Sequence, residues 1–202
     1  MEKECRKRYN LILSAEDSFA RAVALGVWMQ RPLTAWHYLL PGMFLFDFTR
    51  RSGVTKRYSS FFLFPRKLAL DVAWQMLQGE DQSHTLVQAE GELKEWLTHL
   101  KLHSERILRG HMKQIQVLVS HYSNLLQAEG DNYPALVRNI YKTSESYQAF
   151  LQELSLAEQE VDKAIAEQQG ETQEVWKRLR AEQAQVEDLR KKENKKIFSR
   201  TE

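Results

Sequence analysis

The sequence predicts an all-α protein, and three observations lead to this prediction. Apolar residues recur at steps of three and four over most of the chain, which is the spacing of one face of an α-helix. No segment alternates apolar and polar residues as a half-buried strand would. The residues Gly-Asp-Asn at 130–132, followed by Pro134, are typical of a tight turn between two helices. With 202 residues, 43% of them hydrophobic, the chain can bury a sizeable core.

Residues 1–80 are expected to form a cluster of short helices with proline breaks. Pro41-Gly42 is expected to split one of these helices, and Ser52-Gly53 to end it, because proline and glycine both disfavour a helix interior. A further piece covers residues 55–64. Pro65 suits the first turn of the helix that follows, since its missing N–H would have no helical partner there.

Residues 81–170 are expected to form a long antiparallel hairpin that resembles a coiled coil. One apolar seam runs from Leu86 to Leu125 and a second from Ile140 to Ala164, both in steps of three and four. Two long helices joined by the turn at 130–132 would lie side by side. Residues 171–202 are rich in Glu, Gln, Lys and Arg, so a charged and partly mobile C-terminal helix is expected there.

Composition and charge exclude several classes of protein. Cys5 is the only cysteine, which rules out an internal disulfide and a cysteine-rich zinc site, and we expect a cytoplasmic protein without an export signal. No run without a charge is longer than that from Pro32 to Phe46, which would extend only about 22 Å as a helix. Crossing a bilayer core takes about 30 Å, so we expect no spanning segment.

The most informative stretch of the chain is residues 31–67. Nine of the 21 aromatic residues lie between Trp36 and Phe64, and seven Lys or Arg residues accompany them against one acid, Asp47. Apolar rings beside unpaired cations suit a surface that is both apolar and anionic, such as the headgroup region of a membrane. The residues expected to contact the membrane are Trp36, Phe44, Phe46, Arg50, Arg51, Lys56, Arg57, Phe61, Phe62, Phe64, Arg66 and Lys67.

Two other interpretations of this stretch stay open. The rings can instead form the core of a compact helical head, with the cations on its outside, since aromatic clusters usually mark a core. Aromatic rings interleaved with arginine can also stack on nucleic-acid bases. Nucleic acid is disfavoured as a partner here, because the net charge of the chain is only +2.

A metal site has one candidate, formed by Glu95, His99 and His103. These residues are spaced so that all three can face one side of a helix. A di-metal carboxylate bundle would show Glu-x-x-His on two helices, and no histidine of this chain has a Glu three residues before it. No nucleophile elbow, phosphate-binding loop or dinucleotide-binding glycine pattern is present, so neither an enzyme nor a cofactor is expected.

The leading hypothesis is therefore a non-enzymatic membrane-associated scaffold or adaptor. It would dock on an anionic membrane surface through residues 31–67, at the inner face of a membrane, and present residues 86–165 to a protein partner or to a second copy of itself. The first alternative is a soluble oligomeric helical interaction protein with its aromatic residues buried. The second alternative is a helical protein that binds a metal through Glu95, His99 and His103.

Overall fold

The computed structural model of the chain describes residues 2–29, 43–102 and 104–199, and every regular element in this part is a helix. The all-α prediction is therefore confirmed. The described helices are α1 (Glu2–Met29), α2 (Met43–Leu77), α3 (Gln82–His99), α4 (Glu105–Gln127), α5 (Tyr133–Tyr141), α6 (Ser144–Gln168) and α7 (Gln173–Phe198).

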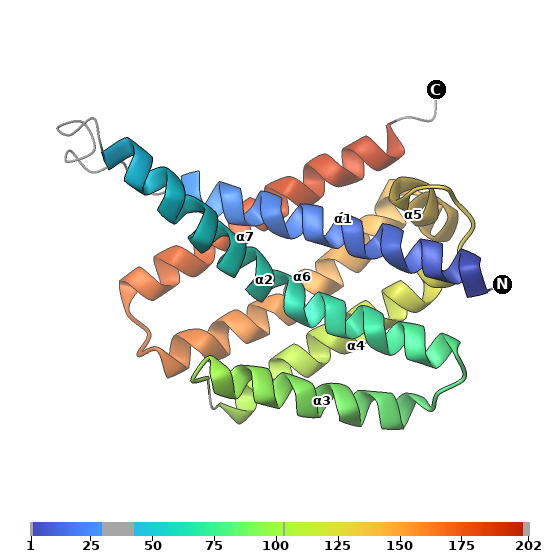
Figure 1. Ribbon diagram of the computed structural model, residues 1–202, viewed down its shortest axis with the longest axis horizontal. Helices are drawn as coiled ribbons and strands as arrows, with labels where there is room; N and C mark the ends of the chain where they lie inside the picture. The colour runs from blue at the N-terminus through green and yellow to red at the C-terminus, as the bar shows by residue number, and fades with distance from the viewer. Residues whose placement is uncertain (1, 30–42, 103, 200–202) are drawn as a thin grey trace.

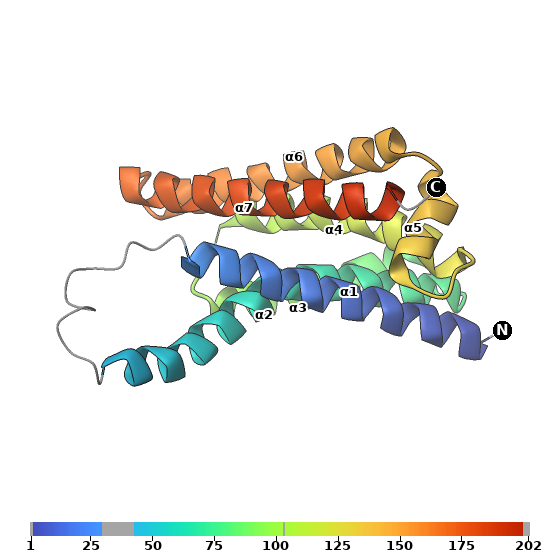
Figure 2. The ribbon, with the colours of Figure 1, turned by 90° about the horizontal axis from the view of Figure 1, so that it is seen from above.

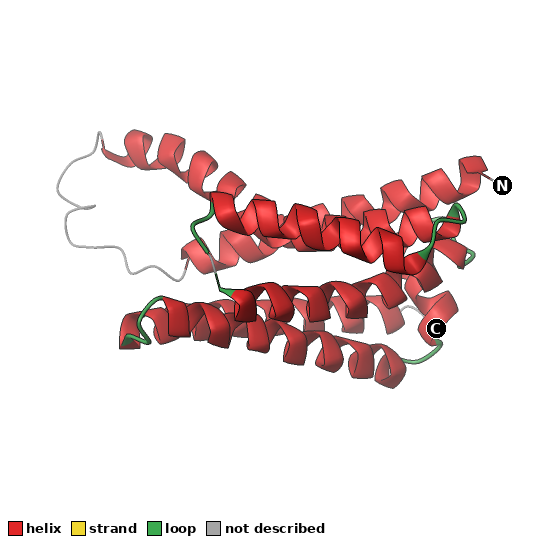
Figure 3. Ribbon diagram, turned by 90° about the horizontal axis from the view of Figure 1, so that it is seen from below, coloured by secondary structure: helices red, strands yellow, loops and turns green. Residues whose placement is uncertain are grey.

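The helices form two layers, which Figures 2 and 3 show edge-on. One layer contains α1, α2 and α3, and the other contains α4, α6 and α7, while the short α5 lies at the end where α1 begins (Figure 1). The layers meet mainly where α2 packs on α4. Leu70, Leu118 and Ile197 belong to one hydrophobic cluster, although they come from the three segments predicted from the sequence. The division of the chain into domains at residues 80 and 170 stays a prediction.

α2 differs from its prediction, because it is one helix where separate pieces were expected. It passes through Ser52-Gly53 and contains Pro65 in its interior, while the predicted break at Pro41-Gly42 lies outside the described residues. A proline inside a helix costs about 3 kcal/mol or more. Contacts on both sides of Pro65 hold the helix in place: Phe64 stacks on Trp96 of α3 with the ring centroids 4.6 Å apart, and Arg66 is ion-paired to α1 and α6. α2 bends along its length (Figure 2), and an interior proline is a common cause of such a bend.

The predicted hairpin of two long helices is four helices in the structure. Lys101, with a φ of 59°, and the N-cap Ser104 separate α3 from α4. Lys142, with a φ of 61°, and the N-cap Thr143 separate α5 from α6 in the same way. A left-handed residue ends a helix and a side-chain cap starts the next one, so the backbone turns without a glycine or a proline. α4 and α6 still pack against each other.

The turn predicted at residues 130–132 does separate two helices, α4 and α5. Asn132 is the N-cap of α5, and its side chain accepts a hydrogen bond from the backbone N–H of Ala135 at 3.0 Å. Pro134 lies in the first turn of α5, where its fixed φ suits a helix start.

α7 is more closely packed than its composition predicts. It contacts α1, α5 and α6, and its residues Val186, Arg190, Asn194 and Ile197 are buried. These residues follow helical spacing but only two of them are apolar, so a count of apolar residues does not reveal the buried face. α7 is therefore part of the bundle up to Phe198.

Gly110 allows α4 and α6 to approach closely, and this contact supports a prediction. A Cβ at Gly110 would lie 3.1 Å from Cγ2 of Val161 and 3.4 Å from its backbone. Gly110→Leu should therefore lower the free energy of unfolding by roughly 1–3 kcal/mol through overpacking. At Gly91, inside α3, a Cβ would meet no atom within 4 Å, so Gly91→Leu should raise the free energy of unfolding by about 0.5–1 kcal/mol. Urea unfolding of both variants tests this contact, and equal effects would contradict it.

Candidate functional site

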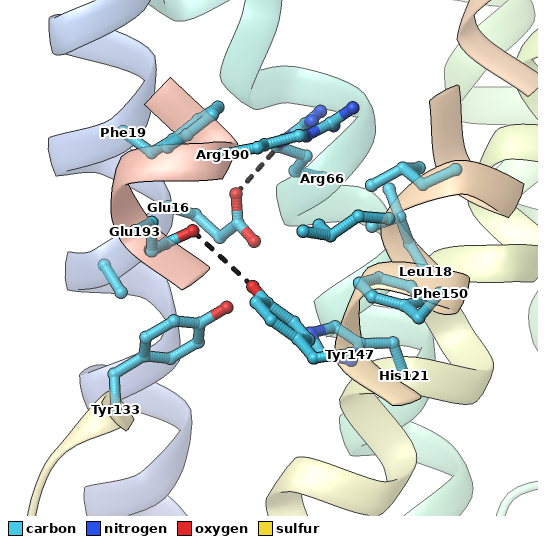
Figure 4. Close-up of a pocket in the computed structure, with 13 residues that line it drawn as sticks. Glu16, Phe19, Arg66, Leu118, His121, Tyr133, Tyr147, Phe150, Arg190 and Glu193 are labelled. Atoms are coloured by element: carbon cyan, nitrogen blue, oxygen red, sulfur yellow. Dashed lines mark hydrogen bonds and ion pairs between the residues drawn. The ribbon is translucent and has the colours of Figure 1, made fainter. Parts of the chain in front are cut away.

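Four charged side chains from four helices meet in the interior, and we call them the buried charge cluster: Glu16 of α1, Arg66 of α2, Glu158 of α6 and Arg190 of α7. Nε of Arg66 lies 3.1 Å from Oε2 of Glu16, and its Nη2 lies 2.8 Å from Oε1 of Glu158. Arg190 donates two hydrogen bonds to Glu158, at 2.8 and 2.9 Å. Figure 4 shows Arg66 and Arg190 beside Glu16. Arg66 is only 2% exposed, so its charge depends on these partners.

The cluster compensates its own charges. Burial alone would raise the pKa of Glu158, but Arg190 and Arg66 outweigh this effect and lower the pKa to about 2. The hydroxyl of Tyr122 donates to Oε1 of Glu16 at 2.7 Å, and the guanidinium carbon of Arg66 lies 4.0 Å from the ring centroid of Phe62. The buried charges of Arg66 and Glu158 are thus stabilised by ion pairs, by hydrogen bonds and by the ring of Phe62. We interpret the cluster as a structural element that fixes the two layers relative to each other.

A small cavity of about 30 Å³ lies next to this cluster (Figure 4) and has space for about one water molecule. The hydroxyl of Tyr147 donates to Oε2 of Glu193 at 3.5 Å, and Tyr133 also lines the cavity. Burial, with a contribution from Glu16, raises the pKa of Glu193 to about 7. The cavity is too small for an organic substrate, so these groups do not form an active site by themselves.

His121 is a buried neutral histidine at the same place. Its ring stacks on Phe150 with the centroids 4.0 Å apart, and its Nδ1 lies 2.7 Å from the hydroxyl of Tyr141. Burial, with a contribution from the positive charge of Arg66, lowers the pKa of His121 to about 3. The histidine therefore stays neutral at physiological pH.

A much larger open site lies between α2, α6 and α7, and we call it the α2–α6–α7 groove. Its volume is about 620 Å³, within the range of small-molecule sites. Phe61, Phe62 and Trp96 form an aromatic wall, and Val175 and Leu179 of α7 lie among the other lining residues. Four carboxylates also line the groove: Glu158, Asp162, Glu182 and Glu187. Apolar walls with a few polar groups are typical of a binding site, whereas no nucleophile with an adjacent base lines this groove.

The structure describes only part of the predicted membrane-contact set. Trp36 lies outside the described residues, and the side chains of Phe44, Phe46, Arg50, Arg51 and Arg57 are also outside the description, although their backbone belongs to α2. Lys56 and Phe61 are exposed. Lys67 is exposed as well, and its Nζ lies 2.6 Å from Oδ2 of Asp71 one turn later.

Three residues of the predicted membrane-contact set pack against other helices of the bundle. Arg66 is paired with Glu16 and Glu158, so it cannot reach a phosphate on the surface. Phe62 is half-buried against Phe19 and Arg66, and Phe64 is half-buried on Trp96. A helix that passes between two others buries residues on more than one face, and here Phe62 meets α1 while Phe64 meets α3.

The metal candidate is only partly described. Nε2 of His99 and Oε1 of Glu95 lie 3.8 Å apart and both side chains are exposed, while His103 lies outside the described residues. Across the part of the chain that the structure describes, no group of three or more His, Cys, Asp or Glu side chains is arranged to hold a metal ion.

The sequence prediction did not identify the buried charge cluster or the groove. One signal was available for Glu158: it lies between Ala157 and Val161 in the apolar seam of α6, and a charge at such a position needs a partner. The identity of that partner depends on how α2 and α7 pack on α6, which the spacing of residues does not give.

Comparison with known proteins gives no relative: no family model, no curated protein and no solved structure matches this chain. Among the helices that the structure describes, none has both the length and the apolar character that a bilayer crossing requires.

Proposed function

We propose that the protein is a non-enzymatic membrane-associated adaptor. It docks on an anionic membrane surface through residues 31–61 and holds its helical bundle, with the surface for a protein partner, on the cytoplasmic side. The docking segment is shorter than residues 31–67, because Arg66 is buried and Phe62 and Phe64 pack half-buried on α1 and α3. The proposal rests on the course of α2 and on the residues that its first half contains.

The first half of α2 stands clear of both helix layers in Figures 2 and 3, while its second half packs on α1, α3 and α4. Residues 43–57, which begin this helix, contain three phenylalanines and four Lys or Arg residues against one acid. A helical segment of this composition outside a bundle needs cover for its rings and counter-ions for its cations. The headgroup region of an anionic membrane provides both.

The two described side chains at the end of this segment fit the same surface. Lys56 is exposed and Phe61 is 43% exposed, so both side chains can reach a surface that lies next to α2. Each cation near an anionic bilayer contributes about 1 kcal/mol of binding free energy. Each ring transferred from water adds roughly 1.5–3 kcal/mol. Four cations and a few rings are therefore sufficient for stable, salt-dependent binding.

Co-sedimentation with vesicles tests the proposal. The protein should pellet with vesicles that contain phosphatidylserine and stay in the supernatant with vesicles of phosphatidylcholine alone. Arg50→Glu with Arg51→Glu should weaken binding at least about tenfold, because it reverses two of the cations. Phe44→Ser with Phe46→Ser should weaken it to a similar extent at every salt concentration.

The matched control is Lys191→Glu with Lys192→Glu, which makes the same change of charge at exposed positions of α7. This variant should bind anionic vesicles nearly as well as the wild-type protein. If all the charge-reversal variants lose the same affinity, the net charge of the chain rather than residues 31–61 determines binding, and the proposal is wrong.

The burial of Phe62, Phe64 and Arg66 favours the alternative of a soluble oligomeric helical interaction protein. In that case the protein should form one defined oligomer in light scattering without lipid, and anionic vesicles should not bind it. The substitutions Phe44→Ser and Phe46→Ser would then change the oligomeric state or the melting temperature instead of lipid affinity.

A further inference from the structure

The α2–α6–α7 groove has the size and shape of a site for an elongated ligand. Its lining residues on α7 extend from Val175 to Glu187, which corresponds to about 18 Å at the standard helical rise. The lining residues come from α2, α3, α4, α6 and α7. A volume of about 620 Å³ accommodates a ligand with a chain or ring system of that length.

One side of the groove is apolar and aromatic. Phe61 and Phe64 both contact Trp96, with ring centroids 6.2 and 4.6 Å away, so these rings form one continuous aromatic group at the side of α2 and α3. Trp96 also makes an edge contact with His111, whose pKa is lowered by burial and which is therefore neutral. Aromatic faces favour both apolar groups and cations.

The opposite side, on α6 and α7, has carboxylates that pair with no cation among the described side chains. Asp162 accepts one hydrogen bond, at 2.7 Å from Nε2 of Gln183. In the described part of the chain neither Asp162 nor Glu182 forms an ion pair, whereas Glu158 in the same groove has Arg66 and Arg190. Tyr58 also lines the groove, and its hydroxyl lies beside the carboxylate of Glu182. Asp162 therefore has further acceptor capacity, which a cationic donor would fill.

The pKa values of Asp162 and Glu182 in the groove without a ligand agree with this geometry. Burial raises the pKa of Asp162 to about 7, and the negative charges of Glu182 and Glu158 act in the same direction. Burial also raises the pKa of Glu182. Both carboxylates are therefore more strongly protonated than in water, because burial disfavours their charged form. A bound cation would restore their ionised form.

We propose that the groove binds an elongated apolar molecule that carries one ammonium group. The apolar part lies against Phe61, Trp96 and Leu179, and the ammonium group donates hydrogen bonds to Asp162 and Glu182. An anionic ligand is disfavoured, because Arg66, the cation among the described lining residues, is already paired with Glu16 and Glu158. A neutral apolar ligand would leave Asp162 and Glu182 without a cationic partner and binds less tightly.

Isothermal titration calorimetry with three probes of equal chain length tests the chemistry. Octylammonium should bind with a dissociation constant at least about tenfold lower than that of octanol, which corresponds to one compensated charge in a partly buried site. Octanoate should bind more weakly than octanol. If octanoate or octanol binds as tightly as octylammonium, the carboxylates do not select the ligand and the proposal is wrong.

Variants locate the binding site. Asp162→Asn with Glu182→Gln should remove the preference for octylammonium and leave the affinity for octanol nearly unchanged. Glu145→Gln with Glu153→Gln makes the same change of charge at exposed positions of α6 and should bind all probes as the wild-type protein does. Leu179→Trp should weaken the binding of all three probes, because the indole ring would occupy part of the groove.

Two results would overturn the proposal. The first is that the variant of Asp162 and Glu182 retains the wild-type preference for octylammonium while a thermal melt shows that it is folded. The second is that octylammonium does not bind, but an amphipathic helical peptide containing lysine binds and depends on Asp162. The groove would then be a site for a partner helix instead of a small molecule.

Discussion

Replacement of Arg66 by methionine is expected to lower the free energy of unfolding by about 3–5 kcal/mol. Methionine fills a similar volume, so the loss comes from charge and not from a cavity. Without Arg66, the Glu16 carboxylate keeps only the hydrogen bond from Tyr122, and Glu158 keeps only Arg190 as its cation. A buried carboxylate without a cation must either remain charged at a high cost or take up a proton. Urea unfolding at pH 7 measures this loss.

Two further variants separate the charge effect from other causes. Lys67→Met removes a neighbouring cation that is exposed on α2, and it should change the free energy of unfolding by less than about 0.5 kcal/mol. Adding Glu16→Gln to Arg66→Met should recover part of the lost stability, because the unpaired carboxylate is removed. If the free energy of unfolding of Arg66→Met lies within about 1 kcal/mol of the wild-type value, the charge cluster does not fix the two layers.

Acid is expected to destabilise the protein through His121. The pKa of this residue is about 3 in the folded chain, against about 6.5 in an unfolded chain. Between these two values the unfolded chain binds more protons than the folded chain, so the free energy of unfolding falls as the pH falls below about 6.5. Above that pH the contribution is fully present. The loss for this one group reaches roughly 2–3 kcal/mol by pH 4.5, at about 1.4 kcal/mol for each pH unit.

The difference between two stability curves isolates this group. His121→Asn keeps a hydrogen-bond acceptor near Tyr141 but has no proton to bind, so its free energy of unfolding should fall less steeply between pH 6.5 and 4.5 than that of the wild-type protein. His84→Asn replaces an exposed histidine of α3, and its curve should run parallel to the wild-type curve. Parallel curves for His121→Asn and the wild-type protein would show that His121 titrates normally in the fold.

The sequence was sufficient for the fold class and for some helix ends. Periodic apolar residues predicted helices throughout, and Asn132 with Pro134 predicted the start of α5. The breaks at Lys101 and Lys142 were missed, because the apolar seam continues across both positions and neither residue disfavours a helix.

The course of α2 shows how tertiary contacts override local preference. Ser52-Gly53 and Pro65 are typical helix-ending signals, yet the helix continues through both. The stacking of Phe64 on Trp96 and the pairing of Arg66 with Glu158 offset the cost of Pro65. Neither contact could be inferred from spacing, because each joins residues that are far apart in the chain.

The candidate sites were predictable only in part. The aromatic and basic composition of residues 31–61 is visible in the sequence, but which of its rings are free depends on the bundle. The groove could not be predicted, since Asp162 and Glu182 are ordinary acidic residues of two polar helix faces until α6 and α7 are placed beside α2. The composition of α7 did not predict that this helix packs on the bundle.

Amide hydrogen exchange with and without anionic vesicles tests the proposed membrane contact most directly. We predict slower exchange in the presence of vesicles for peptides within residues 31–61, and unchanged exchange in α6 and α7. The effect should disappear in Arg50→Glu with Arg51→Glu. Unchanged exchange over residues 31–61 on vesicles that do bind the protein, or protection centred on α6 and α7, would contradict the account.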